Sequence, residues 1–259
     1  MSRPLDGKVA IFTGAGALKG IGAATVRALC ADGATVLATD INEAGLTEVG
    51  QVLGVETRLL DITQRDQIDA CVASVVAAHG RLDILINNAA TAIGGKPFLE
   101  VTPDDWEISF RVNIKGTADF CQAVIPQMQR QKGGCIINLS SMMGLGGQRA
   151  FGAYTTAKHA LIGMTKTIAD EFGPENIRCT AICPGFVSTD MHEGVNARLA
   201  AEKGMDLQAF KAERYQQVAL RRAGEPAEIG GLIAFTCGPA GAYITGVALP
   251  VTGGVQLGL

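Results

Sequence analysis

Three residues near the middle of the sequence could together transfer a proton to or from a substrate oxygen. Tyr154 and Lys158 are four residues apart in a helical pattern over residues 153–172, so they lie on one helix face, one turn apart. The ammonium favours the phenolate, which predicts a lowered pKa for Tyr154. Ser141 follows a short apolar run, residues 135–139, that is typical of a buried strand. A hydroxyl, a phenol and a cation around one point suit general acid–base catalysis.

A glycine-rich turn near the start of the chain predicts a site for a dinucleotide. The turn lies between a β-rich run and a helical pattern, and a second strand follows that ends in Asp40. In such a βαβ unit, glycines let the backbone approach a pyrophosphate, and the helix N-terminus supplies N–H donors. The carboxylate at the end of the second strand can accept hydrogen bonds from ribose hydroxyls. The glycines of the turn are Gly14, Gly20 and Gly22.

Strand and helix patterns alternate along most of the chain. The predicted strands cover residues 8–13, 34–40, 57–60, 82–86, 135–139, 177–182 and 242–251, and the predicted helices cover residues 64–79, 104–130 (interrupted near 113–116) and 153–172. Because the strands are almost continuously apolar, we expect a parallel sheet covered by helices on both faces, the doubly wound α/β class of Rossmann-type folds. No repeat or linker divides the chain, which predicts a single domain over residues 1–259.

Polar, glycine and proline residues stand at the ends of these strands, namely Gly14, Asp40, Asp61, Asn88, Ser141 and Pro184. Ligands of parallel sheets bind at the carboxyl ends of the strands, so we expect these residues to border one site. Residues 188–222 leave the alternation, because they are charged and helix-prone over residues 196–203 and 207–217. We expect this segment to form a mobile lid over the substrate.

The composition argues against several classes of ligand and location. With 259 residues and 47% apolar content, the chain can bury a substantial core. The net charge of −3 shows no clustering of one sign, which argues against nucleic acid or an anionic membrane as partners. No apolar run reaches the length of a membrane span, and the first residues lack a signal sequence, so we expect a cytoplasmic protein. The seven cysteines lack a C-x-x-C pair and predict reduced, mostly buried thiols, and the three histidines are too widely separated to predict a metal site.

These motifs resemble those of the classical short-chain dehydrogenase/reductase family over nearly the whole chain. Ser141 stands 13 residues before Tyr154, which is the usual spacing in that family. The other matching motifs are Thr13-Gly14, Gly20-Ile21-Gly22, Asp61-Ile62, Asn87-Asn88-Ala89, Asn113, Tyr154-x-x-x-Lys158, Pro184-Gly185 and Gly246 with Gly253-Gly254. The resemblance implies a nicotinamide-dependent oxidoreductase, in which the cofactor carries the hydride and the protein handles the proton.

The resemblance also implies a role for each matching residue. Tyr154 would be the general acid/base, Lys158 would lower its pKa and hold the nicotinamide ribose, and Ser141 would bind the substrate oxygen. Asn113 would anchor a water of the proton relay. The implied cofactor contacts are Gly14, Gly20, Ile21 and Gly22 at the pyrophosphate, Asp61 and Ile62 at the adenine, Asn88 on the adenosine side, and Val187 and Thr189 at the nicotinamide carboxamide. The family usually pairs its long middle helices between subunits, which implies a homotetramer.

Residues at two positions predict different cofactors. Lys19 stands just before Gly20, where family members that use NADP often carry a basic residue, whereas an acid at the position of Asp40 is typical of NAD users. Asp40 is fixed at a strand end and would repel the phosphate of NADP at close range. A lysine on a flexible stem is easily screened by solvent. We therefore expect NAD as the cofactor.

The expected activity is the NAD(H)-dependent interconversion of a secondary alcohol and a ketone. The glycine turn has five residues between Gly14 and Gly20 where three are usual, which is closer to the divergent enoyl-reductase branch, although that branch spaces its tyrosine and lysine differently. The alternatives are an NADP(H)-dependent 3-oxoacyl or enoyl thioester reductase and a non-catalytic dinucleotide-binding protein. A nucleotide-sugar epimerase usually needs a longer C-terminal substrate domain. The lid carries apolar residues and cations (Arg198, Lys203, Arg214), which permits hydroxy acids, polyols, acyl thioesters or cyclic ketones as substrates.

Overall fold

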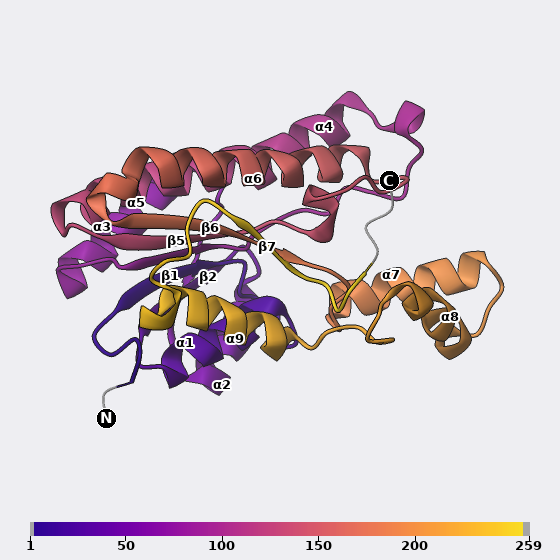
Figure 1. The fold of residues 1–259 in the computed structure, drawn as a ribbon, viewed down its shortest axis with the longest axis horizontal. Helices are drawn as coiled ribbons and strands as arrows, with labels where there is room; N and C mark the ends of the chain where they lie inside the picture. The colour runs from indigo at the N-terminus through magenta and orange to yellow at the C-terminus, as the bar shows by residue number, and fades with distance from the viewer. Residues whose placement is uncertain (1–2, 256–259) are drawn as a thin grey trace.

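A seven-stranded parallel sheet forms the centre of the computed structural model, which describes residues 3–255 (Figure 1). Its strands are β1 (Val9–Thr13), β2 (Thr35–Asp40), β3 (Glu56–Leu59), β4 (Ile84–Asn87), β5 (Gly134–Leu139), β6 (Ile177–Pro184) and β7 (Ala248–Val251). Their order is β3-β2-β1-β4-β5-β6-β7, so the sheet grows in opposite directions from β1 and β4. Such a switch point opens a ligand crevice at the carboxyl ends of the strands. The doubly wound α/β class predicted from the sequence is confirmed.

Helices cover both faces of the sheet (Figure 1). One layer holds α3 (Arg65–His79), α4 (Pro103–Phe110), α5 (Thr117–Arg130) and α6 (Gly152–Phe172), and the other holds α1 (Ile21–Ala31), α2 (Glu43–Leu53) and α9 (Pro226–Cys237). Along β1, Val9 and Ile11 pack into the core of the first layer, whereas Ala10 and Phe12 pack into that of the second. Successive residues of a strand point to opposite faces, which is why a sheet covered on both sides needs continuously apolar strands. No helix in the described range has both the length and the apolar character needed to cross a membrane.

The segment after β6 leaves the sheet, as the sequence predicts. It forms α7 (Asp190–Glu202) and α8 (Leu207–Arg214), which project beyond the carboxyl ends of the strands (Figure 1). Thr189 and Asp206 cap the N-termini of these helices, because their side-chain oxygens accept hydrogen bonds from backbone N–H groups of the first turn. α7 and α8 pack chiefly against each other rather than against the two helix layers. We call residues 188–222 the lid.

The interruption predicted near residues 113–116 is a π-helical turn, Arg111–Gly116, between α4 and α5. α4 begins with a capping box, in which Thr102 and Asp105 each bind the other's backbone N–H. Turns of the π type are uncommon and are frequent at functional sites. This one buries Asn113 beneath the carboxyl end of the sheet.

The sequence predicts a last strand over residues 242–251, which is longer than the strand that forms. Within that range only β7 pairs with β6. Just upstream, the carbonyl oxygens of Gly241 and Ile244 accept hydrogen bonds from Arg178 Nη1 at 3.0 Å each. These two carbonyls are therefore bonded to a side chain rather than to a neighbouring strand. Pro250 lies in this edge strand, as predicted, where its missing N–H group leaves no neighbouring strand unpaired.

Two helices, α2 and α9, are absent from the sequence prediction. The pattern of α9 is weakened by adjacent glycines, Gly230 and Gly231, which have a poor helix propensity. In the structure Gly230 lies against α1, where a Cβ atom would come within 2.9 Å of the backbone of Ala24. The glycine therefore permits a close approach of two helices, and that tertiary contact outweighs the local propensity.

All seven cysteines are free thiols, and five of them are buried, in line with the prediction of mostly buried thiols. Burial raises the pKa of Cys71 to about 11, which keeps this thiol protonated. The Sγ atoms of Cys135 and Cys237 are 4.0 Å apart, in hydrogen-bond contact.

Candidate active site

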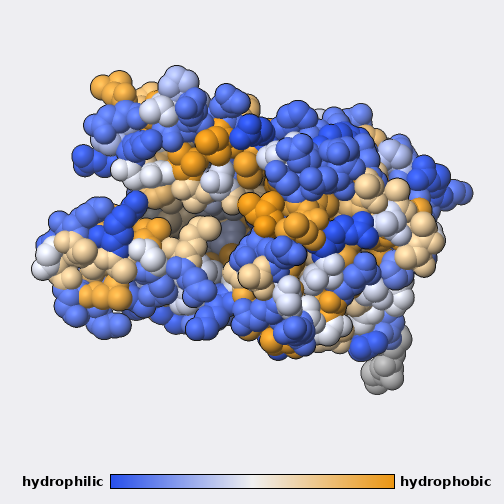
Figure 2. All heavy atoms as spheres, turned by 180° about the vertical axis from the view of Figure 1, so that it is seen from behind, coloured by the Kyte–Doolittle hydropathy of each residue, from blue (hydrophilic) through white to orange (hydrophobic). Residues whose placement is uncertain are grey.

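The carboxyl ends of the strands and the lid enclose a cavity of about 530 Å³. Figure 2 shows the molecule hollowed between the lid and the layer that holds α4 and α6, with apolar side chains inside the hollow. Ser141, Tyr154 and Lys158 line the cavity. All residues predicted to contact the cofactor line it as well, namely Gly14, Gly20, Ile21, Gly22, Asp40, Asp61, Ile62, Asn88, Tyr154, Lys158, Val187 and Thr189. The fold thus brings together segments that are far apart in the sequence, because each follows a parallel strand.

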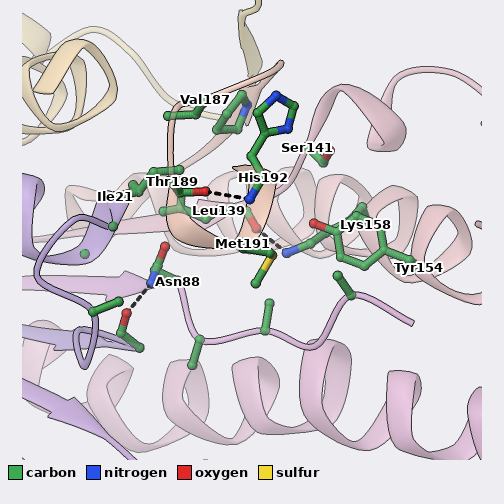
Figure 3. Close-up of a pocket in the computed structure, with 18 of the residues that line it drawn as sticks. Ile21, Asn88, Leu139, Ser141, Tyr154, Lys158, Val187, Thr189, Met191 and His192 are labelled. Atoms are coloured by element: carbon green, nitrogen blue, oxygen red, sulfur yellow. Dashed lines mark hydrogen bonds between the residues drawn. The ribbon is translucent and has the colours of Figure 1, made fainter. Parts of the chain in front are cut away.

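Ser141, Tyr154 and Lys158 meet on one wall of the cavity (Figure 3). Ser141 follows β5, and its Oγ accepts a hydrogen bond from Met143 N at 3.1 Å, which orients the hydroxyl. Tyr154 and Lys158 extend from α6, and the ammonium nitrogen lies 5.4 Å from the centre of the tyrosine ring. Lys158 Nζ donates to Leu139 O at 2.6 Å, so the end of β5 holds the ammonium. One strand and one helix therefore position all three groups.

The pKa of Tyr154 differs from the sequence prediction. Burial raises it to about 12, and a hydrogen bond with Ser141 offsets the rise only in part. Burial also lowers the pKa of Lys158 to about 8, because a buried ammonium loses its hydration. The predicted lowering by Lys158 is wrong for this structure, since the ammonium binds the Leu139 carbonyl and lies over the ring. At neutral pH the phenol keeps its proton, which equips Tyr154 to act as an acid.

Asn113 is buried in the π-helical turn and lies outside the cavity lining. Its Oδ1 accepts a hydrogen bond from Thr91 N, and its Nδ2 donates to Thr91 O, both at 2.9 Å. The amide thereby fixes the loop that follows β4 next to the site. The water-anchoring role implied by the resemblance stays a prediction. The clamp on Thr91 has no signal in the sequence, because it depends on how the turn folds.

The glycine-rich turn forms a cradle that fits a pyrophosphate. Gly14 has φ +75°, and a Cβ atom on Gly22 would lie 2.7 Å from Gly14 O, so neither position tolerates a side chain. α1 begins at Gly20 without a side-chain cap, which leaves its first N–H groups to an anionic ligand. Asn88 braces the cradle from β4, with Nδ2 donating to Gly14 O at 2.7 Å. These residues fit the dinucleotide that the motif predicts.

Asp40 shapes the lengthened turn as well as lining the cavity. Its Oδ2 accepts a hydrogen bond from Gly16 N at 2.7 Å, and its Oδ1 accepts one from Asn42 N at 2.9 Å. Asn42 Nδ2 donates in turn to Gly16 O at 2.9 Å. The extra length of the turn is therefore folded back onto the end of β2, and Asn42 is a site residue that the sequence prediction lacks. Lys19 is exposed and lies outside the cavity lining.

The other predicted cofactor contacts are held by local turns and caps. Asp61 Oδ1 accepts a hydrogen bond from Thr63 N at 2.8 Å, which keeps the carboxylate at the end of β3. Thr189 Oγ1 accepts one from His192 N at 3.3 Å at the start of α7. Val187 pairs with Gly224 in an isolated bridge. Figure 3 shows Val187 and Thr189 on the lid side of the cavity, across from Asn88.

The lid adds residues that were not among the predicted site residues. His192 Nε2 lies 3.1 Å from Tyr215 OH, and its ring stacks on Phe186 with centroids 5.3 Å apart. Burial lowers the pKa of His192 to about 4, so the imidazole is neutral at physiological pH. Arg214, at the end of α8, lines the cavity as well. The lid therefore contributes a packed group of aromatic and polar side chains rather than a loose cover.

Comparison with known proteins decides the family. A family model described as enoyl-(acyl carrier protein) reductase matches residues 14–256. The chain is 35% identical over 258 residues to the 3-oxoacyl-(acyl-carrier-protein) reductase FabG of Thermotoga maritima, a match that covers 98% of this chain and 99% of the relative. It is 36% identical over 258 residues to dehydrogenase/reductase SDR family member 6 of Xenopus laevis, with the same two coverages. The chain belongs to the short-chain dehydrogenase/reductase family.

Solved structures share the fold of this short-chain dehydrogenase/reductase. NAD+-bound xylitol dehydrogenase is 34% identical with a TM-score of 0.89, and the match covers 96% of this chain and 99% of the other. Levodione reductase is 28% identical with a TM-score of 0.91, and the match covers 96% and 98%. These relatives are all named as oxidoreductases, but they are named for different substrates. The present chain is therefore an oxidoreductase, and its substrate has to be argued from its own cavity.

Proposed function

We propose that this short-chain dehydrogenase/reductase interconverts a secondary alcohol and a ketone with NAD(H). The observation that carries the proposal is the meeting of Ser141, Tyr154 and Lys158 beside the glycine cradle, within one cavity. A bound nicotinamide would supply or accept the hydride. The phenol of Tyr154 would give its proton to the ketone oxygen during reduction and take a proton from the alcohol during oxidation.

Ser141 and Lys158 would prepare this proton transfer. The hydroxyl of Ser141 lines the same cavity as the phenol of Tyr154, so it can hold a substrate oxygen near that proton. The charge on Lys158 would stabilise the phenolate that remains after donation. Its ammonium has three donors, and the Leu139 carbonyl takes one of them, which leaves others for a ribose hydroxyl. Asn113 would act indirectly, through the loop at Thr91.

The preference for NAD is supported by the charges around the cavity. The lining near Asp40 carries no cation among the described residues, and Lys19 is exposed outside it. The phosphate of NADP would meet the carboxylate of Asp40 at close range, which is unfavourable for two like charges. We expect a cost of roughly 2–3 kcal/mol, or about 30- to 150-fold in favour of NAD.

A screen of secondary alcohols with NAD and NADP at matched ionic strength tests the proposal. Absorbance of the reduced cofactor measures the rate, and we expect turnover with NAD at the higher efficiency. Equal or better efficiency with NADP would contradict the cofactor assignment. If no alcohol or ketone reacts although the cofactor binds, the proposed reaction is wrong, and the remaining alternatives are an enoyl thioester reductase and a non-catalytic dinucleotide-binding protein. The complete group of Ser141, Tyr154 and Lys158 argues against that outcome.

A second candidate is an NADP(H)-dependent reductase of 3-oxoacyl or enoyl thioesters. The description of the matching family model and the lengthened glycine turn favour it. The two reactions differ in the bond that is reduced, a C=O or a C=C bond. Incubation with a 3-oxoacyl thioester and with a 2-enoyl thioester, each with NADH and with NADPH, separates the candidates by product. Faster reduction of either thioester with NADPH than of any simple ketone with NADH would favour the second candidate.

We further propose that the protein is a homotetramer. Large apolar side chains are exposed on and just before α4, namely Phe98, Leu99, Ile108 and Phe110, and near α9 and β7, namely Phe235, Tyr243 and Val247. Two separate apolar surfaces suit an assembly with more than one twofold interface. Light scattering at micromolar concentration should return four times the chain mass, and a monomer mass would contradict the proposal. The cytoplasmic location expected from the sequence stays a prediction.

A further inference from the structure

The lid carries six basic side chains, and one of them lines the cavity. Four form ion pairs away from the cavity, namely Arg198 with Glu202 at 3.7 Å, Lys203 with Glu213 at 3.5 Å, Lys211 with Glu193 at 2.9 Å and Arg222 with Glu228 at 2.7 Å. Arg221 is exposed outside the lining. Arg214 is half-buried, lines the cavity, and has no acid partner within 4.0 Å among residues 3–255.

Neighbouring side chains hold the guanidinium of Arg214 in one orientation. Its Nη1 donates to Oδ1 of the buried Asn196 at 2.6 Å, and Asn196 Nδ2 donates to Tyr215 OH at 3.3 Å. The guanidinium carbon lies 4.7 Å from the ring centre of Phe186 and 6.0 Å from that of Phe210. A guanidinium has five N–H donors in a planar fork, and the contacts within the described chain use one of them. The others are available to a ligand.

The charge of Arg214 is not compensated by its neighbours. His192 is neutral, because burial lowers its pKa to about 4, and Glu193 is paired with Lys211. Asp190 also lines the cavity but lies beyond ion-pair distance of the guanidinium. Burial lowers the pKa of Arg214, yet a guanidinium stays protonated in proteins. A partly buried cation without an anion is unfavourable, so an anionic ligand would be stabilised there.

Among residues 3–255, Lys158 and Arg214 are the only lysine and arginine that line the cavity. Lys158 belongs to the proton-transfer group, whereas Arg214 stands in the lid, and Met142, Phe186 and Val195 add apolar surface to the same cavity. We propose that Arg214 binds the carboxylate of the substrate, which is a hydroxy acid or the matching keto acid with its hydrocarbon chain against the apolar lining. This inference rests on the proposed function and selects one of the substrate classes that the sequence leaves open.

A carboxylate fits this site better than a phosphate. Both groups match the planar fork of a guanidinium. A phosphate monoester carries almost two charges at neutral pH, however, and the lid supplies one cation to the lining among the described residues. We therefore expect the phosphate analogue of a substrate to bind less well than the carboxylate.

The kinetic test uses 3-hydroxybutanoate, 4-hydroxypentanoate and 5-hydroxyhexanoate, each with its amide, and 4-hydroxypentyl phosphate. We expect the wild type to prefer at least one acid over its amide and over the phosphate by about tenfold or more in kcat/KM. Arg214→Met should lower kcat/KM for that acid by about 10- to 100-fold, mainly through KM, and change the amide by less than about threefold. Arg214→Lys should keep part of the preference, because it keeps the charge but loses the fork.

Lys203→Met is the matched control, since Lys203 also lies over the Phe210 ring, at 5.4 Å, but pairs with Glu213 outside the cavity. It should leave the preference for the acid unchanged, and thermal melting shows whether each variant is folded. Equal use of acids and amides by the wild type, or equal losses for both in Arg214→Met, would overturn the inference. If 4-hydroxypentyl phosphate were a better substrate than the acids, Arg214 would be assigned to a phosphate group instead of a carboxylate.

Calorimetry provides a readout that does not need turnover. With NAD present, pentanoate should bind to the wild type and to Lys203→Met, and binding should fall by about tenfold or more in Arg214→Met. Pentanamide should bind weakly to all three. If pentanoate binds through Arg214 but no alcohol is oxidised, the carboxylate site stands and the proposed reaction is wrong. If neutral alcohols are oxidised and pentanoate binding ignores Arg214, the reaction stands and the carboxylate site is wrong.

Discussion

The polar groups at the strand ends and those in the lid are held in place in different ways. At the strand ends, backbone carbonyls accept hydrogen bonds from side chains of other segments, as Leu139 O accepts one from Lys158 of α6 at 2.6 Å and Gly14 O accepts one from Asn88 at 2.7 Å. In the lid, side chains bind one another, as Arg214 binds Asn196 and His192 contacts Tyr215. The sheet therefore fixes the groups for which we propose a role in the reaction, whereas the lid positions its groups through contacts of its own.

The two regions also differ in how firmly they are attached. The strand-end residues belong to elements that pack on both sides of the sheet, whereas α7 and α8 pack chiefly on each other. An element with few contacts to the core opens at a lower free-energy cost. This difference supports the expected closure of the lid over a substrate, with Arg214 carried by the moving part.

The largest expected effect is beside the strand ends, where Tyr154 extends from α6 into the cavity. Tyr154→Phe removes the hydroxyl that we propose as the proton donor and leaves the ring, so turnover should fall by about 10²- to 10⁴-fold while cofactor binding stays nearly intact. Steady-state kinetics and fluorescence titration with NADH measure the two properties. Lys158→Met is the comparison, because it should impair both turnover and binding. A Tyr154→Phe enzyme that kept more than about a tenth of the wild-type rate would show that the assigned role is wrong.

The sequence predicts the strand ends far better than the lid. Gly14 and Ser141 follow a strand and Asp40 ends one, so the alternation alone places them at one edge of the sheet. The clamp of Asn113 on Thr91 could not be predicted, because it requires a π-helical turn that no periodicity specifies. The missed helix α9 depends in the same way on contact with another helix rather than on its own residues.

The lid shows the same limit at the level of single charges. The sequence shows Arg198, Lys203 and Arg214 only as cations of the predicted lid, which leaves several substrate classes open. Only the folded lid pairs the first two with acids and turns the third to the cavity. The prediction of a lowered pKa for Tyr154 is wrong for a related reason. The spacing of Tyr154 and Lys158 predicts the nearby cation but not the degree of burial of the phenol. Strand position is local information, whereas burial and ion pairing are properties of the whole fold.

The pH dependence of stability tests how completely the ammonium of Lys158 is buried beside the strand ends. The pKa of Lys158 is lowered from 10.5 to about 8, so the unfolded chain binds more protons than the folded one between these values. The contribution of Lys158 to the free energy of unfolding is therefore lowest below pH 8 and rises as the pH approaches 10.5. The free energy of unfolding of the wild type, relative to Lys158→Met, should rise by roughly 2 kcal/mol between pH 8 and pH 10 in urea titrations. A flat difference would show that the ammonium is hydrated.

His192 provides the corresponding test in the lid. Its pKa is lowered from 6.5 to about 4 by burial, so protonation opposes folding and stability is lost as the pH falls below 6.5. Because the ring is only partly enclosed, we expect the wild type to lose about 1–2 kcal/mol relative to His192→Asn between pH 7 and pH 5. Calorimetric melting at the two pH values measures the loss. If the lid stays open most of the time, the imidazole is hydrated and the two proteins respond equally.

The smallest effect concerns Asp40, which has both a charge and a structural role in the glycine turn. Asp40→Ser should shrink the preference for NAD at least about tenfold, mainly by improving the use of NADP, because it removes the negative charge. The same change also removes the acceptor for Gly16 N, which loosens the turn for both cofactors and makes the gain with NADP smaller than loss of the charge alone would give. Asp40→Asn removes the charge but keeps one side-chain oxygen for the turn, and it should therefore relax the preference with less loss of affinity. Kinetics with both cofactors at matched ionic strength measure the two effects separately. If Asp40→Asn kept the full preference while Asp40→Ser lost it, turn geometry rather than charge would select NAD.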